Sequence, residues 1–346
     1  MSEFNYEIKH DAPHRVFTSE SSRQHSSAKS YPEAVRNTLQ ISLFSQSDDE
    51  LTFDLSGIDV SIANALRRIM LSEVPTMAVE NVYIEMNTSI IFDEVLAHRL
   101  GLIPINADPR KFKMVEKEVS DEKGGKTREV FNEDNTIIFT LNKVCKRPVH
   151  IPSVVDGRPY TENIYSSDFK WQPQGNQSQT FPDGISPLYP DILIAMLRPG
   201  QEISLEMHCR KGNGMDHAKF SPVATSSYRL HPKITITKDL DEDSAEKLVQ
   251  ICPMNVFDIE DVGSVKTAKV ARPRNCTMCR ECIRGPGWSD RIKLERISNH
   301  FIFKVESCSA LKSAEILLES VQILRQKCAA FINMVDGSQT FPQNSA

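Results

Sequence analysis

The sequence predicts an α+β fold in which one discontinuous domain is interrupted by an inserted β-rich domain. Residues 41–59 alternate apolar and polar side chains around an acidic turn, which is typical of a strand pair, and helical spacing follows directly. Residues 106–221 instead combine short strand-like runs with charged and polar loops. Strand character returns at 225–237 and again at 301–307, before a long helix. We therefore expect the chain to leave its first domain and re-enter it.

The composition is that of an ordinary globular protein. The 346 residues correspond to about two domains, and 40% hydrophobic with 25% charged residues argues against overall disorder. The 41 basic and 46 acidic residues give a net charge of -5, whereas a dedicated nucleic-acid-binding protein is usually basic. No stretch approaches the roughly 20 apolar residues of a membrane-spanning helix, so we expect no membrane association.

The first elements follow from local signals. Residues 1–38 carry many serines and little apolar periodicity, which predicts a mobile arm. A helix then begins after Asp59, a good N-terminal cap, and ends before Pro75. Residues 77–91 are strand-rich, and a short helix follows that Gly101 and Pro104 close.

A long C-terminal helix is expected at about 309–334. Its apolar residues are separated by alternating steps of four and three, which forms a heptad seam. Two interpretations remain open, a core helix of the chain's own domain and a helix that packs against a partner. The seam consists of Leu317, Val321, Leu324, Cys328, Phe331 and Val335.

The strongest chemical signal is a set of four cysteines, namely Cys252, Cys276, Cys279 and Cys282. In bacterial-type ferredoxins the cysteine that precedes proline ligates the cluster held by the other cysteine run. Because Pro253 follows Cys252 and the other three have C-x-x-C-x-x-C spacing, the set is complete for one four-iron cluster. Zinc also accepts four thiolates, and a cysteine patch without metal is the third possibility. Either metal would close the loop-rich segment 250–290.

Two further signals are weaker. Arg67 and Arg68 are neighbours on a predicted helix, so their side chains point about 100° apart and at least one faces outward. Both a solvated surface and an interface anchor fit that position. The GGKT stretch at 124–127 is similar to the end of a phosphate-binding loop, but Ser120 stands where that motif requires glycine. A nucleotide-dependent enzyme is therefore the weakest hypothesis.

Residues 59–105, DVSIANALRRIMLSEVPTMAVENVYIEMNTSIIFDEVLAHRLGLIPI, strongly resemble the α-motif of RNA polymerase α-like subunits, a family with bacterial, archaeal and eukaryotic members. Residues 301–326 look like the second half of the same dimerisation domain. The resemblance implies a dimerisation domain at 39–105 and 222–336 that contains the ferredoxin-like cysteine segment. It also implies an inserted domain at 106–221 and a C-terminal tail at 337–346.

Within that family, the length, the arm and the layout are most similar to the branch that eukaryotic RNA polymerases I and III share. The resemblance implies a nuclear and nucleolar subunit that is not catalytic alone and meets DNA only through the complex. Its implied partners are a smaller α-like subunit, the two large catalytic subunits and small assembly subunits. The polymerase II relative carries a zinc-binding cysteine group in its insert, whereas this insert has only Cys145 and Cys209.

The resemblance also assigns roles to residues. It implies that the seam of the C-terminal helix meets the smaller α-like partner. The residues implied to face or lie near the polymerase body are Asn64, Arg67, Arg68, Glu94, His98 and Arg99. Two alternatives to this function stay open, an α-like subunit of another RNA polymerase and a stand-alone iron–sulfur redox protein.

Overall fold

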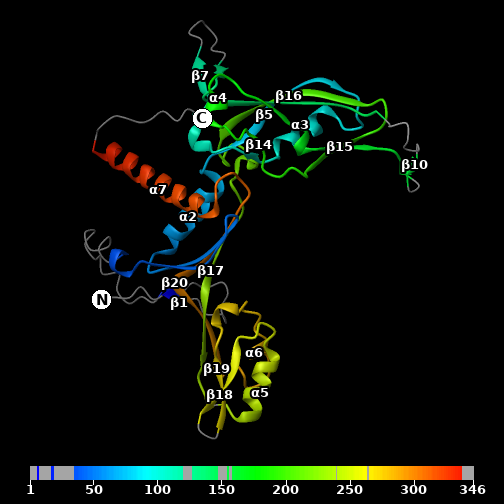
Figure 1. Ribbon diagram of the computed structural model, residues 1–346. Coiled ribbons are helices and arrows are strands. Elements are labelled where there is room, and N and C mark those ends of the chain that lie inside the picture. The colour runs from blue at the N-terminus through cyan, green and yellow to red at the C-terminus, as the bar shows by residue number, and fades with distance from the viewer. Residues whose placement is uncertain are drawn as a thin grey trace. The chain divides into compact units, whose positions relative to one another are not determined.

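The computed structural model describes residues 6–7, 17–18, 35–119, 127–146, 154–155, 158–238, 240–262 and 265–336 (Figure 1). Most of the predicted arm, the predicted tail and residues 124–126 of the GGKT stretch lie outside these ranges. The chain divides into two compact units: Met1–Ser45, Thr52–Asn64 and Ser227–Lys304 form the first, and Gln46–Leu51, Ala65–Ser226 and Val305–Ala346 the second. The domain boundaries expected from the sequence stay a prediction.

The first unit is built on a four-stranded sheet in the order β17-β20-β4-β3. β3 (Gln40–Gln46) and β4 (Glu50–Ser56) form the predicted strand pair, and β17 (Val223–Ile236) and β20 (Ile292–Ser307) complete the sheet. On β4, Phe53 is buried while Asp54 is half-buried, as alternation requires. The Phe53 ring stacks on Phe303 of β20, with 5.0 Å between ring centroids.

The cysteine segment is a small α/β body of the first unit. β18 (Phe257–Val262) and β19 (Val265–Val270) form an antiparallel hairpin, and α5 (Glu242–Ile251) packs against both of its strands (Figure 1). The short helices η4 (Pro273–Asn275) and α6 (Glu281–Arg284) carry the chain past the last three cysteines. The buried residues of this body are Leu240, Ala245, Leu248, Val256, Phe257, Cys276, Cys282, Ile292 and Leu294.

One polar cluster joins the cysteine segment to the sheet of the first unit. The Arg274 guanidinium forms an ion pair with Asp54 on β4 and lies over the Phe44 ring, 4.2 Å from its centroid. His300 Nε2 lies 3.0 Å from the other Asp54 oxygen. Arg229 donates to the backbone oxygen of Arg274 at 2.7 Å. Asp54 is therefore the carboxylate on which this cluster converges.

The second unit contains the other large sheet, in the order β13-β9-β16-β5. Its strands are β5 (Thr76–Asn87), β9 (Thr136–Val144), β13 (Lys170–Gln172) and β16 (Glu202–Gly212). Buried side chains alternate along β16, and they join a core cluster that includes Leu96 and Leu100 of α3 (Asp93–Gly101). The strand-rich character expected for 106–221 is therefore present, and the α+β fold class is confirmed.

Short elements complete this unit. They are β6 (Ile105–Asn106), β7 (Glu116–Val119), β8 (Thr127–Val130), β10 (Val154–Val155), β11 (Arg158–Pro159), β12 (Glu162–Tyr165), β14 (Ser186–Pro187), β15 (Leu193–Leu197), α4 (Gln177–Thr180), η1 (Pro109–Lys111), η2 (Ser166–Asp168) and η3 (Ala218–Phe220). β12 pairs with β15, and β14 pairs with β6. At the N-terminal end of the chain, β1 (Tyr6–Glu7) pairs with β2 (Phe17–Thr18).

The predicted helices lie close to their expected positions. α2 (Val60–Ser72) begins after Asp59, whose carboxylate accepts a hydrogen bond from the Ser61 N–H at 2.8 Å. Gly101, which was expected to close α3, is its last helical residue. The C-terminal cap is Leu102. α7 (Ser313–Val335) begins four residues later than expected, and Glu315 accepts from the Lys312 N–H at 3.1 Å. None of the helices in the described ranges combines the length and hydrophobicity needed to cross a bilayer.

The cluster around Asp54 predicts a pH-dependent stability. Burial alone raises the pKa of Asp54, but hydrogen bonds and charges from Arg274 and His300 outweigh it and hold the pKa below 3.8. A lowered folded-state pKa stabilises the fold above the ordinary value, and the contribution is lost as pH falls through the folded-state value. We expect Asp54→Asn to lower the free energy of unfolding by roughly 1–3 kcal/mol near neutral pH, measured by urea denaturation.

The deficit of Asp54→Asn should shrink well below pH 3.8. Asp258→Asn serves as the control, because its ion pair with Arg272 is exposed and should contribute less than about 1 kcal/mol. A deficit of Asp54→Asn that is the same at neutral and at strongly acidic pH would contradict the role given to this carboxylate.

Candidate subunit interfaces and a cysteine pocket

The predicted seam on α7 faces largely outward. Ile316 and Ser320 are fully buried in the second unit, whereas Leu317 and Leu324 are half-buried and Val321, Cys328 and Phe331 are exposed. From residue 325 to 336 every residue except Ala330 is exposed. A large exposed apolar surface on a globular protein marks an interaction site. This exposure favours the partner interface over a core helix, and the assignment of each seam residue stays a prediction.

Polar contacts attach a different side of α7 to its own unit. Lys327 forms an ion pair with Glu73, with Nζ–Oε distances of 2.6 and 2.8 Å. Arg110 lies 3.3 Å from a Glu315 oxygen and 4.0 Å from a Glu319 oxygen. These contacts fix the rotation of α7 about its axis, so the apolar residues that remain uncovered keep a defined orientation.

The residues implied to face the polymerase body differ in their surroundings. On α2, Asn64 and Arg67 are half-buried while Arg68 is exposed, as the 100° step between neighbours requires. On α3, Glu94, His98 and Arg99 are exposed. No comparison or contact tests their proposed roles, which stay predictions.

Arg99 has a local function that the sequence did not indicate. Its Nε donates to the Ile194 backbone oxygen at 3.1 Å, and its second guanidinium nitrogen donates to the Leu193 oxygen at 2.7 Å. Because both acceptors belong to β15, Arg99 anchors α3 to that strand. Among these three residues of α3, Glu94 and His98 are therefore the better placed to meet a partner.

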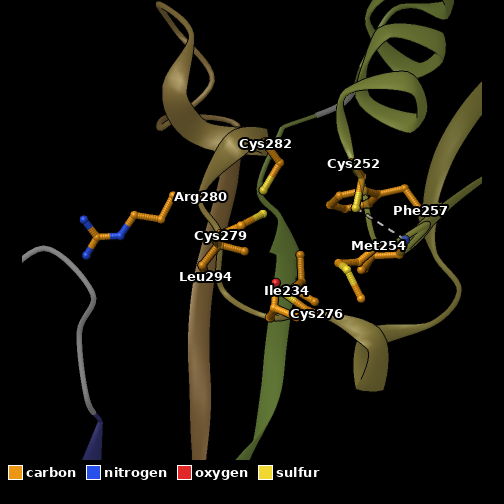
Figure 2. A pocket seen from close by; sticks show the side chains of 11 residues that line it. Ile234, Cys252, Met254, Phe257, Cys276, Cys279, Arg280, Cys282 and Leu294 are labelled. Atoms are coloured by element: carbon orange, nitrogen blue, oxygen red, sulfur yellow. Dashed lines mark hydrogen bonds between the residues drawn. The ribbon is translucent and has the colours of Figure 1, made fainter. Parts of the chain in front are cut away.

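All four predicted cysteine ligands line one small pocket in the first unit (Figure 2). Cys252 lies at the end of α5, across the pocket from Cys279 and Cys282 (Figure 2). Cys276 and Cys282 are buried and Cys279 is exposed. The remaining walls are mainly apolar and come from Ile234, Met254, Val256, Phe257 and Leu294.

The backbone of the cysteine loops is unusual. The N–H of Val256 donates to the Cys252 sulfur, and the N–H of Met278 to the Cys276 sulfur, each at 3.4 Å. Within the described residues, the non-glycine positions with left-handed φ are Asn255, Met278 and Arg280, all in these loops. Strained backbone of this kind persists where surrounding interactions impose it, and it clusters at functional sites.

The surroundings of the pocket disfavour the charged thiolate form of its cysteines. Burial, together with the smaller effect of the neighbouring cysteines, raises the pKa of Cys282 to about 12. Burial also raises the pKa of Cys276, while the hydrogen bond from the Met278 N–H lowers it by a smaller amount. A bound cation would remove this penalty, since metal binding deprotonates its thiol ligands.

The pocket fits a thiolate-bound group only in part. In the described ranges, no three His, Cys, Asp or Glu side chains are placed to share one metal ion. Zinc–sulfur bonds of about 2.3 Å would require the ligand sulfurs to lie within about 4 Å of one another. The thiols as placed therefore do not form a single-ion zinc site, although the four donors do surround one space. An iron–sulfur cluster and zinc both stay predictions.

The fold and these surfaces define a class of protein. A helix whose apolar face is left uncovered is typical of a subunit that assembles with others. A sequence profile described as the RNA polymerase Rpb3/Rpb11 dimerisation domain matches residues 52–328. The chain belongs to this family of RNA polymerase subunits, which confirms the resemblance seen in the α-motif.

Several relatives match over most of their length. The Dictyostelium discoideum protein named DNA-directed RNA polymerases I and III subunit rpac1 is 47% identical over 298 residues, covering 85% of this chain and 81% of the relative. The human subunit RPAC1 of polymerases I and III is 45% identical over 296 residues, covering 84% and 83%. The Dictyostelium discoideum polymerase II subunit rpb3 is 33% identical over 291 residues, covering 81% and 89%.

The exposed seam predicts a defect in assembly without a defect in folding. Phe331 is 63% exposed, so Phe331→Asp should leave the free energy of unfolding within about 0.5 kcal/mol of wild type. If α7 is an interface, the same change should weaken partner binding by about 30-fold, the effect of losing a hot-spot residue. Leu324→Asp should also prevent binding, but this half-buried residue would perturb the monomer as well.

Co-expression with the smaller α-like subunit followed by size-exclusion chromatography checks this prediction. Gln326→Asp, an exposed polar position on the same helix, is the control and should assemble normally. Normal assembly of Phe331→Asp would show that the outer part of α7 is not the interface.

Proposed function

We propose that this chain is the α-like assembly subunit shared by RNA polymerases I and III. The observation that carries the proposal is the 45–47% identity, over 84–86% of the chain, to relatives that bear this name. The polymerase II relative from Dictyostelium discoideum is 33% identical, which supports the assignment within the family.

The proposed role of the chain is to position other subunits, and the chain itself catalyses no reaction. The apolar seam of α7 would pack against the equivalent helix of a smaller α-like subunit, and burying apolar surface stabilises such a dimer by about 25 cal/mol per Å². Arg68 on α2, with Glu94 and His98 on α3, would then contact the two large catalytic subunits. Small assembly subunits would complete this platform, and DNA would be met only through the assembled enzyme.

The cellular consequences follow from that assignment. Such a subunit works in the nucleus, including the nucleolus. It supports synthesis of ribosomal RNA precursors by one polymerase and of 5S ribosomal RNA and transfer RNA by the other. The alternative of a stand-alone iron–sulfur redox protein is less well supported, because an isolated monomer would leave the α7 seam in water.

The cysteine pocket would have a structural role in this subunit. Cys252 belongs to the end of α5, while Cys276, Cys279 and Cys282 belong to the loop around η4 and α6. A thiolate-bound metal centre would join these two segments, and its binding free energy would be folding free energy of the segment. An iron–sulfur cluster or a zinc ion would each supply this cross-link.

Affinity purification of the tagged full chain from nuclear extract tests the main proposal. We expect mass spectrometry to recover a smaller α-like subunit together with the large subunits of both polymerases I and III. Recovery of polymerase II components alone would assign the chain to another branch of the family. Recovery of no polymerase subunit would overturn the proposal.

Elemental analysis tests the cysteine pocket. In the purified complex we expect iron or zinc bound to wild type and lost from the double variant Cys279→Ser/Cys282→Ser. The variant should also unfold at a temperature several degrees lower, since about 1 kcal/mol corresponds to roughly 2–4 °C in a domain of 150–250 residues. Cys308→Ser, a half-buried cysteine of the second unit, is the control. Absence of both metals from wild type would contradict a metal centre.

A further inference from the structure

Two histidine rings stack beside the polar cluster around Asp54. His231 of β17 and His300 of β20 have ring centroids 4.5 Å apart and an interplanar angle of 26°. Histidine is the side chain whose ordinary pKa lies nearest to physiological pH, so its charge responds to small changes of pH. A stacked pair of imidazoles in a charged cluster can therefore act as a proton-sensitive element.

The cluster lies where the cysteine segment joins the sheet of the first unit. β17 and β20 are neighbours in that sheet, and the chain between them, residues 237–291, is here called the body. Arg274 of the body forms an ion pair with Asp54 of β4 and lies over the Phe44 ring of β3. We call the Arg274–Asp54 ion pair the latch, because it attaches the body to strands other than the two that lead into it.

The two stacked histidines have different partners. His300 Nε2 lies 3.0 Å from an Asp54 oxygen, so a proton on this ring is compensated by the carboxylate. The Nδ1 atom of His231 is buried and has no hydrogen-bond partner. A proton on His231 would place its positive charge against the face of His300, without a carboxylate of its own.

The charges that face His231 are mainly positive. Arg229 lies two residues away on β17 and donates to the Arg274 backbone oxygen at 2.7 Å, His300 comes from β20, and Arg274 comes from the body. Asp54 on β4 is the carboxylate of the cluster. Burial and the charge of His300 lower the pKa of His231 below 6.5, and the adjacent backbone and Asp54 oppose this shift only in part.

The direction of the pH effect follows from this environment. When the latch opens, His231 regains water and its pKa returns to about 6.5. The open state therefore binds a proton more readily than the closed state, so opening is favoured as pH falls through that value. Asp54 acts in a separate range, because its own pKa lies below 3.8.

We propose that His231 and His300 form a proton-sensitive switch that controls the attachment of the body to the sheet. At neutral pH the uncharged His231 ring stacks on His300, and Arg274 stays paired with Asp54. Protonation of His231 sets two positive rings against each other and releases Arg274, while β17 and β20 keep the body tethered. The switch lies in the first unit and is independent of the proposed function.

Hydrogen exchange of the full chain between about pH 7.5 and about pH 5 tests the switch. Labelling times are scaled to the pH dependence of an unfolded peptide, so that the remaining change reports opening. We follow residues 271–276, where the Asn275 and Cys276 amides donate to backbone oxygens at 3.1 and 3.0 Å. Their opening should rise at least about threefold as pH falls. Peptides from β16 of the second unit are the internal reference and should not change.

Replacement of His231 shows whether this ring is the sensor. His231→Phe keeps a flat ring that can stack on His300 but cannot take a proton, so the pH-dependent rise should be abolished. His217→Asn is the matched control and should retain the rise, because His217 is an exposed histidine of the second unit. A rise of the same size in His231→Phe, or no rise in wild type, would overturn the proposal.

A direct titration keeps the proposal testable even if His231→Phe opens the latch at every pH. The histidine rings of the full chain are labelled with carbon-13 and followed by NMR, and the His231 signal is the one that His231→Phe lacks. We expect a wild-type midpoint below 6.5. Arg274→Gln should move it toward 6.5, since an open body exposes the ring. A wild-type midpoint at or above 6.5 would contradict the switch.

Discussion

α7 carries more apolar side-chain surface than its own unit covers, and the assembly role that we propose depends on this uncovered surface. Ile316 and Ser320 are fully buried in the second unit, but beyond residue 324 the helix is exposed except at Ala330. Exposing such a surface to water costs free energy roughly in proportion to its apolar area. A partner helix that buries it therefore gains free energy without any new chemistry in this chain.

The uncovered apolar surface of α7 also explains why the polar contacts of the second unit matter. The ion pair of Lys327 with Glu73 and the contacts of Arg110 fix α7, and the bonds from Arg99 to β15 fix α3. Surface ion pairs contribute little stability by themselves. In the proposed assembly role, these contacts would orient apolar faces for a partner to cover, so rigidity would precede binding.

Sequence periodicity predicted the α+β class, because strands and helices repeat their apolar residues at different intervals. The interface role of the α7 seam stays a prediction. Periodicity missed the exposure of Ile90 and Phe92, since these residues stand in a loop where periodicity carries no signal. Arg99 was expected to meet a partner, yet it binds carbonyl groups more than 90 residues away in the chain. The left-handed backbone at Asn255, Met278 and Arg280 was equally invisible, because these residue types do not require it.

Hydrogen exchange of the full chain, alone and in complex with the smaller α-like subunit, tests the central claim most directly. The seam predicts that amide protection rises on complex formation over Val321–Val335, where most side chains lie exposed in the single chain. The buried strands of the second unit should be unchanged. Equal protection of this part of α7 in both states would contradict the account, since the helix would then have no interface to cover.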